Sequence, residues 1–394
     1  MENLRVLELY SGIGGMHYAL TESGVAAKVV AAVDVNTTAN EIYKHNFPNT
    51  PLLPKTIEGM TLDDFNKLSF DMILMSPPCQ PFTRYHPYEF TSLNYVFILM
   101  NKYMLWGLTL IFPCRLTKLP RFILLENVKG FETSSARDSL VKMLKECGYN
   151  YQELMVSPTC LGMPNSRLRY FMIAKAPPGS FSFHTTSEIQ EGFPQPADKV
   201  LLEPSSLISP SPTSTAYQEE DHKEDEGGIL YKLERAQDAE RKISQNRDQS
   251  LRQISVYLED QGEGEMEQYL LPTKTLLRYA LLMDIVRPTC RRSVCFTKGY
   301  GHYVEGTGSV LQSCMETDME AAFKSPERLS DEEKLNQLSR LKLRYFSPRE
   351  IANLMGFPKH FTVPKNISTK QQYRVLGNSL NVHVVARLIE LLVS

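Results

Sequence analysis

The sequence of 394 residues lacks an excess of charge of either sign, because 43 Lys and Arg are matched by 45 Asp and Glu and the net charge is −2. This balance excludes a polybasic nucleic-acid binder of the histone type, so any nucleic-acid surface has to be local. The chain also lacks a Lys/Arg-rich cluster of about 5–8 residues, the usual nuclear localisation signal. We therefore expect a cytoplasmic protein and leave entry into the nucleus open.

Cysteine is scarce as well, and the seven cysteines form no dense, evenly spaced framework. We expect them to be free thiols in a reducing compartment. No cationic stretch precedes an apolar run at the N-terminus, so we expect no secretory signal. Hydrophobic residues make up 42% of the chain, which excludes a mainly disordered protein, and the length allows two or three domains at roughly 100–200 residues each.

The first 175 residues alternate strand-like runs with helical stretches. Arg5–Leu9 is predicted to be a strand, a glycine turn opens a helix after it, and Val29–Val33 is a second strand before a helix over Asn36–Asn46. This alternation predicts a parallel, doubly wound α/β sheet for residues 1–175. The end of the chain is helical again, and we expect residues 346–394 to return to that sheet.

The middle of the chain divides into two regions. Residues 176–228 are rich in Pro and Ser and then acidic, with six acids against Lys223 between Glu219 and Glu226, which predicts a disordered linker or a surface insertion. Residues 229–345 form a second domain, with helices expected around Leu233–Arg247 and Leu276–Ile285.

A locally basic stretch lies within that second domain. Five Lys or Arg stand against one acid between Arg278 and His302, and aromatic residues are interleaved with them. This combination suits contact with an RNA backbone and stacking on its bases. A solvated basic face explains the same pattern equally well.

The glycine turn and the acid after the second strand point to a nucleotide-like cofactor. A strand, a tight turn and a helix present backbone N–H groups to a ligand, and Asp34 follows about twenty residues later, where an acid can bind ribose hydroxyls. The glycines are Gly12, Gly14 and Gly15, which is not the GxGxxG spacing. A nicotinamide cofactor is therefore less well supported, and S-adenosylmethionine stays open.

A single cysteine follows another predicted strand. The run Ser76–Phe82 contains Cys79 between prolines, directly after the strand that ends at Met75. Ligands bind at the carboxyl ends of parallel strands, and the prolines disfavour a packed helix or strand, so we interpret Cys79 as a nucleophile. The alternative is an inert, buried thiol. An ordinary thiol is mostly protonated at neutral pH, so positive charge or a helix N-terminus has to assist it.

Two further segments place charged side chains near the same edge. Glu126 ends the next predicted strand, and an acid there points into the same crevice, although it could also cap the following turn. Arg167 and Arg169 are two residues apart, which places them on one face of a strand. They could pair with the acid or with a substrate carbonyl, or form a surface ladder.

Taken together, these segments resemble the cytosine-C5 methyltransferases. The matching motifs occur in the family's order: Glu8–Gly15 for the cofactor, Ser76–Phe82 for the nucleophile, Glu126–Val128 for the acid, Arg167–Arg169 for the arginines and Gly377–Leu380 for the return to the cofactor. Within the family, the run Leu270–Gly308 with Cys295-Phe296-Thr297 is most similar to the branch that methylates tRNA-aspartate.

The resemblance implies a Rossmann-like, S-adenosylmethionine-dependent methyltransferase fold. Residues 1–175 would be the catalytic domain, completed by residues 346–394, and residues 229–345 an inserted target-recognition domain. The implied cofactor is S-adenosylmethionine, with no metal ion. The implied cofactor-binding residues are Ile13, Gly14, Gly15, Asp34, Ile57, Glu58, Ser76 and Ser379.

The resemblance also implies the chemistry. Cys79 would add to cytosine C6, Glu126 would contact N3 and the exocyclic amine, and Arg167 and Arg169 would hold the cytosine carbonyl and orient the site. The implied target is cytosine 38 in the anticodon loop of tRNA-aspartate, with weak or no activity on DNA. A base in such a loop is already nearly free to leave the stack.

Residues 85–116 depart from the family, which carries a polar, glycine-containing loop here. This chain instead has the apolar run Leu93–Phe112, with Lys102 as its one charge. A run of this length could span a bilayer, but it would cut the sheet between Cys79 and Glu126, so we expect no membrane helix. It could be a helix docked on the sheet. We favour a translated segment foreign to the family loop, because the match resumes at Lys118.

Three functions remain to be compared at this point. The first is an RNA cytosine-C5 methyltransferase, which the ordered motifs and Cys295–Thr297 favour. The second is a DNA cytosine-C5 methyltransferase, whose chemistry is identical. The third is a catalytically impaired form that binds RNA or the cofactor, because the loop at 85–116 is replaced. A nicotinamide oxidoreductase would leave the proline-bounded cysteine unexplained. Oligomeric state is not indicated by the sequence.

Overall fold

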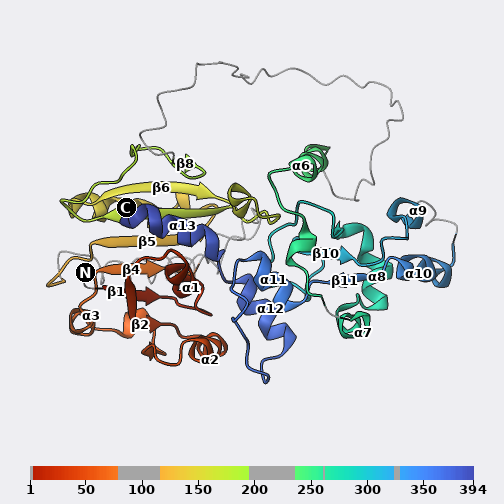
Figure 1. The fold of residues 1–394 in the computed structure, drawn as a ribbon, viewed down its shortest axis with the longest axis horizontal. Coiled ribbons are helices and arrows are strands. Elements are labelled where there is room, and N and C mark those ends of the chain that lie inside the picture. Colours follow the sequence, from red (N-terminus) through yellow and green to blue (C-terminus); the bar gives the residue numbers. More distant parts are fainter. Residues whose placement is uncertain (1–2, 79–115, 195–235, 261, 324–328) are drawn as a thin grey trace, which may run out of the picture.

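The computed structural model describes residues 3–78, 116–194, 236–260, 262–323 and 329–394. These form two lobes placed side by side, the first built on a large sheet and the second on a small one (Figure 1). Cys79 and the segment 85–115 lie outside the described residues, as do residues 195–235.

An eight-stranded sheet organises the first lobe, in the order β3-β2-β1-β4-β5-β7-β6-β8. Its strands are β1 (Leu4–Leu9), β2 (Ala27–Val33), β3 (Leu52–Leu53), β4 (Met72–Met75), β5 (Phe122–Val128), β6 (Asn150–Val156), β7 (Arg169–Lys175) and β8 (Gln190–Glu191). The central pairs β1–β4 and β4–β5 are parallel, with Leu9 beside Met75 and Met75 beside Leu125. Because parallel strands run in one direction, their carboxyl ends meet at a single edge of the sheet.

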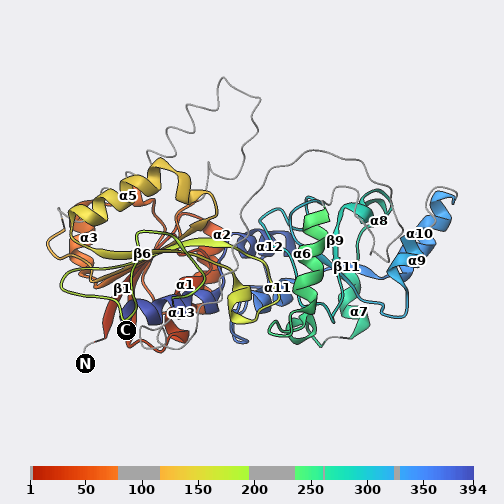
Figure 2. The same cartoon turned by 90° about the horizontal axis from the view of Figure 1, so that it is seen from above.

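Helices cover both faces of this sheet, as Figure 2 shows. The helices α1 (Gly15–Glu22) and α13 (Val382–Val393) pack on one face, and α3 (Leu62–Leu68) and α5 (Ser135–Glu146) pack on the other. Val6 lies in the core that α1 and α13 cover, and its neighbour Leu7 lies in the core that α3 and α5 cover. Because both faces of the strands are buried, their sequences are continuous apolar runs. The predicted α/β fold class is confirmed.

One detail of the sheet differs from the prediction. The sheet is mixed rather than parallel, because β7 runs antiparallel to both β5 and β6. The connection between β6 and β7 contains only a short 3-10 helix, Pro158–Leu161. Without a helix that crosses the sheet face, the chain turns back beside the strand it has just left, and the pair is antiparallel.

The end of the chain returns to the first lobe through α13. This helix has eight buried residues and lies beside α1. The residue that follows this helix, Ser394, is bound to the sheet, because Lys175 Nζ donates to the Ser394 backbone oxygen at 2.5 Å. Two shorter helices precede it, α11 (Pro348–Leu354) and α12 (Thr369–Gly377), and they lie between the lobes in Figure 1. The predicted return of the C-terminus thus begins at the lobe boundary.

The second lobe holds a three-stranded sheet in the order β11-β10-β9. Its elements are α6 (Ala236–Arg247), α7 (Glu263–Met266), α8 (Thr273–Tyr279), β9 (Asp284–Val286), β10 (Ser309–Gln312), α9 (Met319–Phe323), α10 (Asp331–Arg340) and β11 (Leu343–Tyr345). The helix expected over Leu276–Ile285 is wrong at its end, since α8 stops at Tyr279. Asp284 instead pairs with Ser309 of β10, so tertiary pairing overrides the local helical pattern.

Of the two alternatives for residues 176–228, a disordered linker or a surface insertion, the disordered linker is wrong for the first part. Residues 176–194 follow the sheet, and β8 pairs with β6 at Gln190 and Leu154. The Thr186 N–H donates to Gln152 Oε1 at 2.8 Å, and Phe183 is buried in the core. The backbone of this segment finds hydrogen-bond partners at the edge of the sheet, and these order it despite its Pro-rich composition. The remainder of the predicted linker lies outside the described residues.

Candidate functional site

A cleft of about 410 Å³ lies at the carboxyl edge of β1, β4 and β5. Its walls come from parts of the chain that are distant in sequence: the glycine turn, the ends of β2, β4 and β5, the start of β7, Lys298 of the second lobe, and the end of α12 with the residues after it. The size is in the usual range for a small-molecule site, and the position is the one that open α/β sheets use for ligands.

The glycine turn between β1 and α1 forms one wall. Gly12 and Gly14 have φ angles of 53° and 87°, which a residue with a side chain rarely adopts. Gly15 has an ordinary φ but no room, because a Cβ there would lie 3.1 Å from Ser379 Oγ and 3.1 Å from Leu380 Cδ1. The glycines therefore let the turn bend and let the segment after α12 approach it closely.

Asp34, at the end of β2, is tied to this turn. The Gly12 N–H donates to one carboxylate oxygen at 2.8 Å and the Asn36 N–H donates to the other at 2.8 Å. Each oxygen keeps a lone pair for a further donor, such as a hydroxyl group in the cleft. Nearby, the Ser11 hydroxyl is buried without a hydrogen-bond partner in the described part of the chain, and Ser11 lines the cleft.

The end of β4 contributes Ser76, Pro77 and Pro78 to the cleft. The Ser76 hydroxyl donates to the carbonyl of Tyr10 at 3.3 Å, and Asn127 Nδ2 donates to the carbonyl of Pro77 at 3.4 Å. These bonds join the ends of β1, β4 and β5. The predicted nucleophile Cys79 is the next residue along the chain and lies outside the described residues.

Glu126 brings a buried carboxyl group to the same cleft from the end of β5. Its side chain is 11% exposed, and Arg169 Nε lies 3.4 Å from its Oε1 atom. Burial raises the pKa of Glu126 above the ordinary value, while the charges of Arg169 and Arg167 act in the opposite direction. A carboxyl group in this setting can hold a proton at higher pH than a free one.

Arg167 also lines the cleft but is almost fully engaged with the protein itself. One terminal nitrogen donates to the Phe296 carbonyl at 3.0 Å and contacts Cys295 Sγ at 3.3 Å, and the other donates to the carbonyls of Gly377 (3.3 Å) and Ser379. The guanidinium therefore joins the second lobe to the segment after α12. These two nitrogens are already bound to partners within the protein, so in this structure they are not available to hold a cytosine carbonyl, the role predicted for Arg167.

The two arginines do not share a strand face as predicted, because β7 begins at Arg169 and Arg167 precedes it. Arg169 faces Glu126, and Arg167 faces the backbone carbonyls. The chain enters β7 only at Arg169. Arg167 lies in the preceding loop, so the alternation of side chains in a strand does not fix its direction. Of the two, Arg169 is the one that contacts the acid.

The structure brings together most of the predicted site residues. Those lining the cleft are Ile13, Gly15, Asp34, Ser76, Glu126, Arg167, Arg169 and Ser379. Gly14, Ile57 and Glu58 are not among the lining residues. Ile57 is packed in the same apolar core as Leu9, and a side chain at Gly14 would meet the ring of Phe47. Burial raises the pKa of Tyr10, which lines the cleft, and the charge of Glu58 adds to this effect.

Lys298 is a lining residue that sequence reasoning missed. Its segment belongs to the second lobe and passes against Gly377, where any side chain would collide with the backbone of Thr297 and Lys298. The motif Cys295-Phe296-Thr297 was the available signal, but nothing local indicated that it would reach the cleft. Among the described residues, no group of three or more His, Cys, Asp or Glu side chains could hold a metal ion.

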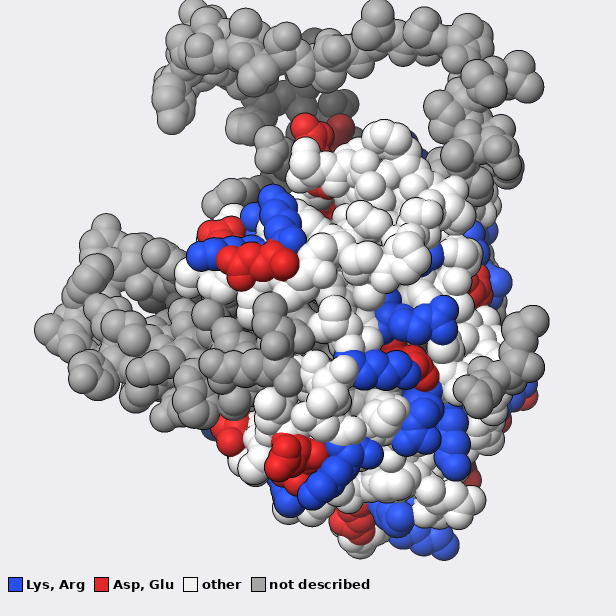
Figure 3. Space-filling view, turned by 90° about the vertical axis from the view of Figure 1, so that its left-hand side faces the viewer, with Lys and Arg blue, Asp and Glu red and all other residues white. Residues whose placement is uncertain are grey.

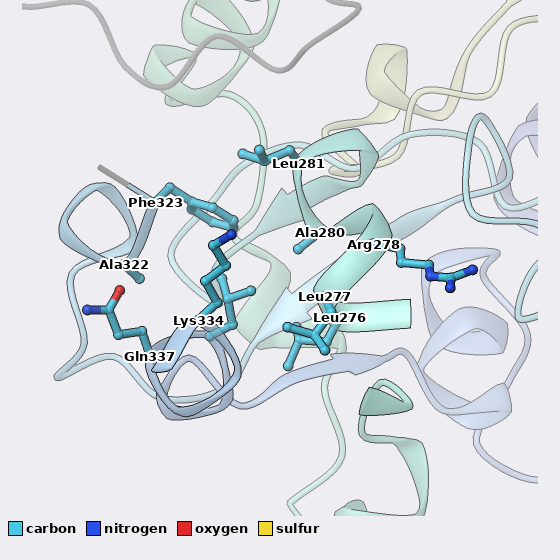
Figure 4. A pocket seen from close by; sticks show the side chains of 10 residues that line it. Leu276, Leu277, Arg278, Ala280, Leu281, Ala322, Phe323, Lys334 and Gln337 are labelled. Atoms are coloured by element: carbon cyan, nitrogen blue, oxygen red, sulfur yellow. The ribbon is translucent and has the colours of Figure 1, made fainter. Parts of the chain in front are cut away.

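A second hollow, of about 80 Å³, lies in the other lobe between α8, α9 and α10 (Figure 4). Leu276, Leu281 and Phe323 line it, with Lys334 at its side. It carries no acid, so we take the larger cleft as the candidate site. On the face drawn in Figure 3, Lys and Arg gather over one part with Asp and Glu among them.

Three comparisons with known proteins bear on this cleft. Residues 4–394 match the family model described as C-5 cytosine-specific DNA methylase. A human protein named tRNA (cytosine(38)-C(5))-methyltransferase is 53% identical, over all of both chains. A Dictyostelium discoideum protein named DNA (cytosine-5)-methyltransferase is 37% identical, over 100% of this chain and 95% of that one. A crystal structure of a Spodoptera frugiperda DNMT2 mutant has a TM-score of 0.73 at 35% identity, with both chains fully covered.

Proposed function

The chain belongs to the C5 cytosine methyltransferase family, and we propose that it transfers a methyl group from S-adenosylmethionine to C5 of cytosine 38 in the anticodon loop of a tRNA, with tRNA-aspartate as the main substrate. The observation that carries this proposal is the Glu126–Arg169 pair in one cleft with the glycine turn, in a chain 53% identical throughout to a protein named for that reaction.

The cleft fits the cofactor that members of the family use. It is large enough for a nucleoside with an amino-acid tail, and it offers polar groups along its wall. Asp34 has free lone pairs for ribose hydroxyls, the Ser11 hydroxyl lacks a partner within the described residues, and Ser379 lies against the glycine turn. When bound, S-adenosylmethionine supplies an electrophilic methyl group.

The chain's own residues would prepare the cytosine. Cytosine C5 is a poor nucleophile, and addition of the Cys79 thiolate to C6 makes C5 electron-rich. The raised pKa of Glu126 favours the protonated carboxyl, which can donate a hydrogen bond to N3 and stabilise the charge that develops in the ring. Arg169 would orient that carboxyl and reach the cytosine carbonyl. Loss of the C5 proton and release of Cys79 then restore the aromatic ring.

A DNA cytosine-C5 methyltransferase is the second candidate, and the relative from Dictyostelium discoideum is the observation that favours it. The chemistry at Glu126 and Arg169 would be the same. The second lobe is small and only locally basic, which favours an exposed loop base over a base held in a duplex, since flipping a paired base costs a few kcal/mol.

The test is methyl transfer from labelled S-adenosylmethionine to an unmodified tRNA-aspartate transcript. We expect transfer by the parent and none by Cys79→Ala, and none to a transcript that carries uracil at position 38. A duplex DNA substrate methylated faster than the tRNA would overturn the choice of RNA. Cofactor binding without methyl transfer would support the alternative of a catalytically impaired form, in which the replaced segment 85–116 prevents the reaction.

A further inference from the structure

The thiol of Cys295 lies between the two arginines of the site. Its Sγ atom is 3.3 Å from a terminal nitrogen of Arg167 and 3.6 Å from a terminal nitrogen of Arg169. Cys295 belongs to the second lobe, and the backbone carbonyl of the next residue, Phe296, is bound by Arg167 as well. The thiol therefore lies where the second lobe meets the cleft. It has no role in the proposed reaction, which uses Cys79, Glu126 and Arg169.

Among the described residues, one carboxylate, that of Glu126, is in direct ion-pair contact with either of the two guanidinium groups beside Cys295. Arg167 is 4% exposed and forms no ion pair with a carboxylate among the described residues, and the side chain of Arg169 is 17% exposed. Glu126 is the carboxylate beside Arg169, and its own pKa is raised by burial. Asp34 also lines the cleft, but its carboxylate oxygens accept from the backbone N–H groups of Gly12 and Asn36, and Lys298 is exposed. Buried charges without a partner are costly, so the cluster favours one more negative group.

The ionisation of Cys295 fits that demand. Burial alone would raise the pKa of this thiol, but the charges and hydrogen bonds of Arg167 and Arg169 outweigh it, and the pKa lies below the ordinary value. These two arginines are the charged groups that act on the thiol directly, and Glu126 stands behind Arg169. Guanidinium groups next to a cysteine favour the thiolate for electrostatic reasons.

We propose that Cys295 is a thiolate counter-ion that holds the guanidinium of Arg169 beside Glu126, and so positions the acid of the cytosine site. Cys295 is a positioning residue and contacts no substrate. The inference rests on the proposed function only for its effect on rate, because the ion cluster itself exists in the free protein.

The role of the thiolate has a consequence for Glu126. With Cys295 ionised, part of the positive charge of Arg169 is neutralised. Without it, the full charge of Arg169 acts on Glu126 and lowers its pKa. A Cys295→Ser variant, which keeps the size of the side chain but stays neutral, should therefore lose the protonated form of Glu126 at a lower pH than the parent does.

The first experiment measures the thiolate directly, by ultraviolet absorbance during a pH titration of the full-length protein. The difference between the parent and Cys295→Ser should show one thiol that ionises below the ordinary value of about 8.5. The matched control is Cys290→Ser, five residues away, because Cys290 is similarly half-buried and accepts a backbone N–H from Arg287 rather than a guanidinium. Replacing Arg169 by Gln should move the Cys295 transition to higher pH.

The second experiment measures methyl transfer against pH. We expect Cys295→Ser to bind S-adenosylmethionine as the parent does, to lower kcat about tenfold, and to move the alkaline limb of kcat/KM to lower pH, whereas Cys290→Ser leaves all three unchanged. If the thiol that Cys295→Ser removes ionises at or above the ordinary value of about 8.5, the proposal is overturned. It is also overturned if the alkaline limb of kcat/KM does not shift in Cys295→Ser. An inactive parent with the expected titration would refute the proposed function while leaving the counter-ion established.

Discussion

Arg167 donates a hydrogen bond to the backbone carbonyl of Gly377 at 3.3 Å, across 210 residues of the chain. The same guanidinium binds the carbonyl of Phe296 in the second lobe. One side chain therefore fastens three segments around the cleft: its own segment just before β7, the segment that enters from the second lobe, and the end of α12 with the residues after it. The shape of the cleft depends on this fastening, because each of the three segments contributes to its lining.

Replacing Arg167 by Lys should destabilise the protein. A lysine has one ammonium group and cannot serve carbonyls on opposite sides, so at least one buried carbonyl loses its donor, at a cost of about 1–3 kcal/mol. Thermal or urea unfolding measures the loss. Arg169→Lys is the matched control, since Arg169 contacts Glu126 at the cleft surface, and we expect it to reduce methyl transfer while unfolding close to the parent. Equal stability of the two variants would contradict this division of roles.

Replacing Glu126 by Gln should leave folding intact and impair the reaction. The amide has the shape of the carboxyl but cannot exchange a proton with the cytosine ring, and such proton transfer is worth roughly 10²–10⁴-fold in rate. We expect kcat for tRNA to fall by about 10²-fold or more, with the alkaline limb of the pH profile lost. Asp138→Asn, an exposed acid on α5, serves as the control. Parental turnover by Glu126→Gln would remove Glu126 from the mechanism.

Stability should depend on pH through Glu8 of β1, which is fully buried. Burial raises the pKa of Glu8 from 4.5 to about 8, even though the Tyr43 hydroxyl donates to its Oε2 atom at 2.8 Å. The folded state therefore keeps a proton that the unfolded state releases. The contribution of Glu8 to stability is full below pH 4.5 and is lost as the pH rises to about 8.

Urea unfolding at a series of pH values tests this dependence. Relative to the parent, Glu8→Gln should gain free energy of unfolding as the pH rises through that interval, because the amide never ionises. Tyr43→Phe should extend the parent's dependence to higher pH, since the hydroxyl that stabilises the carboxylate is removed. A pH-independent difference between the parent and Glu8→Gln would show that Glu8 titrates normally.

Replacing Gly377 by Ala should push the backbone of Thr297 and Lys298, in the second lobe, away from the end of α12 that lines the cleft. A Cβ at this position would collide with the backbone of Thr297 and Lys298, which directly follow Phe296, the residue whose carbonyl Arg167 binds. Overpacking of this kind costs about 1–3 kcal/mol, and we expect methyl transfer to fall with it. Gly264→Ala, where a Cβ meets nothing within 4 Å, should be neutral. The measurements are urea unfolding and methyl transfer.

Much of the site could be read from the chain because its signals are local. The glycine turn before α1, the prolines around Cys79 and the acid at the end of β5 each follow a strand that its own apolar residues identify. Parallel strands bring such ends together whatever lies between them, which is why Asp34, Ser76 and Glu126 line one cleft. The structure locates these side chains, but the roles predicted for them stay predictions, as do those of Cys79, Gly14, Ile57 and Glu58.

The sequence by itself therefore determined the fold class, the family and the kinds of side chain at the site, since periodicity, turn residues and motif order are properties of neighbouring residues. Only the tertiary structure decided that β7 runs antiparallel, that Arg167 serves the backbone and that Cys295 lies between two guanidinium groups. The hydrogen-bond partners of the Arg167 guanidinium are 128 to 212 residues away. Contacts over such separations depend on how the lobes pack, and no local pattern of residues encodes them.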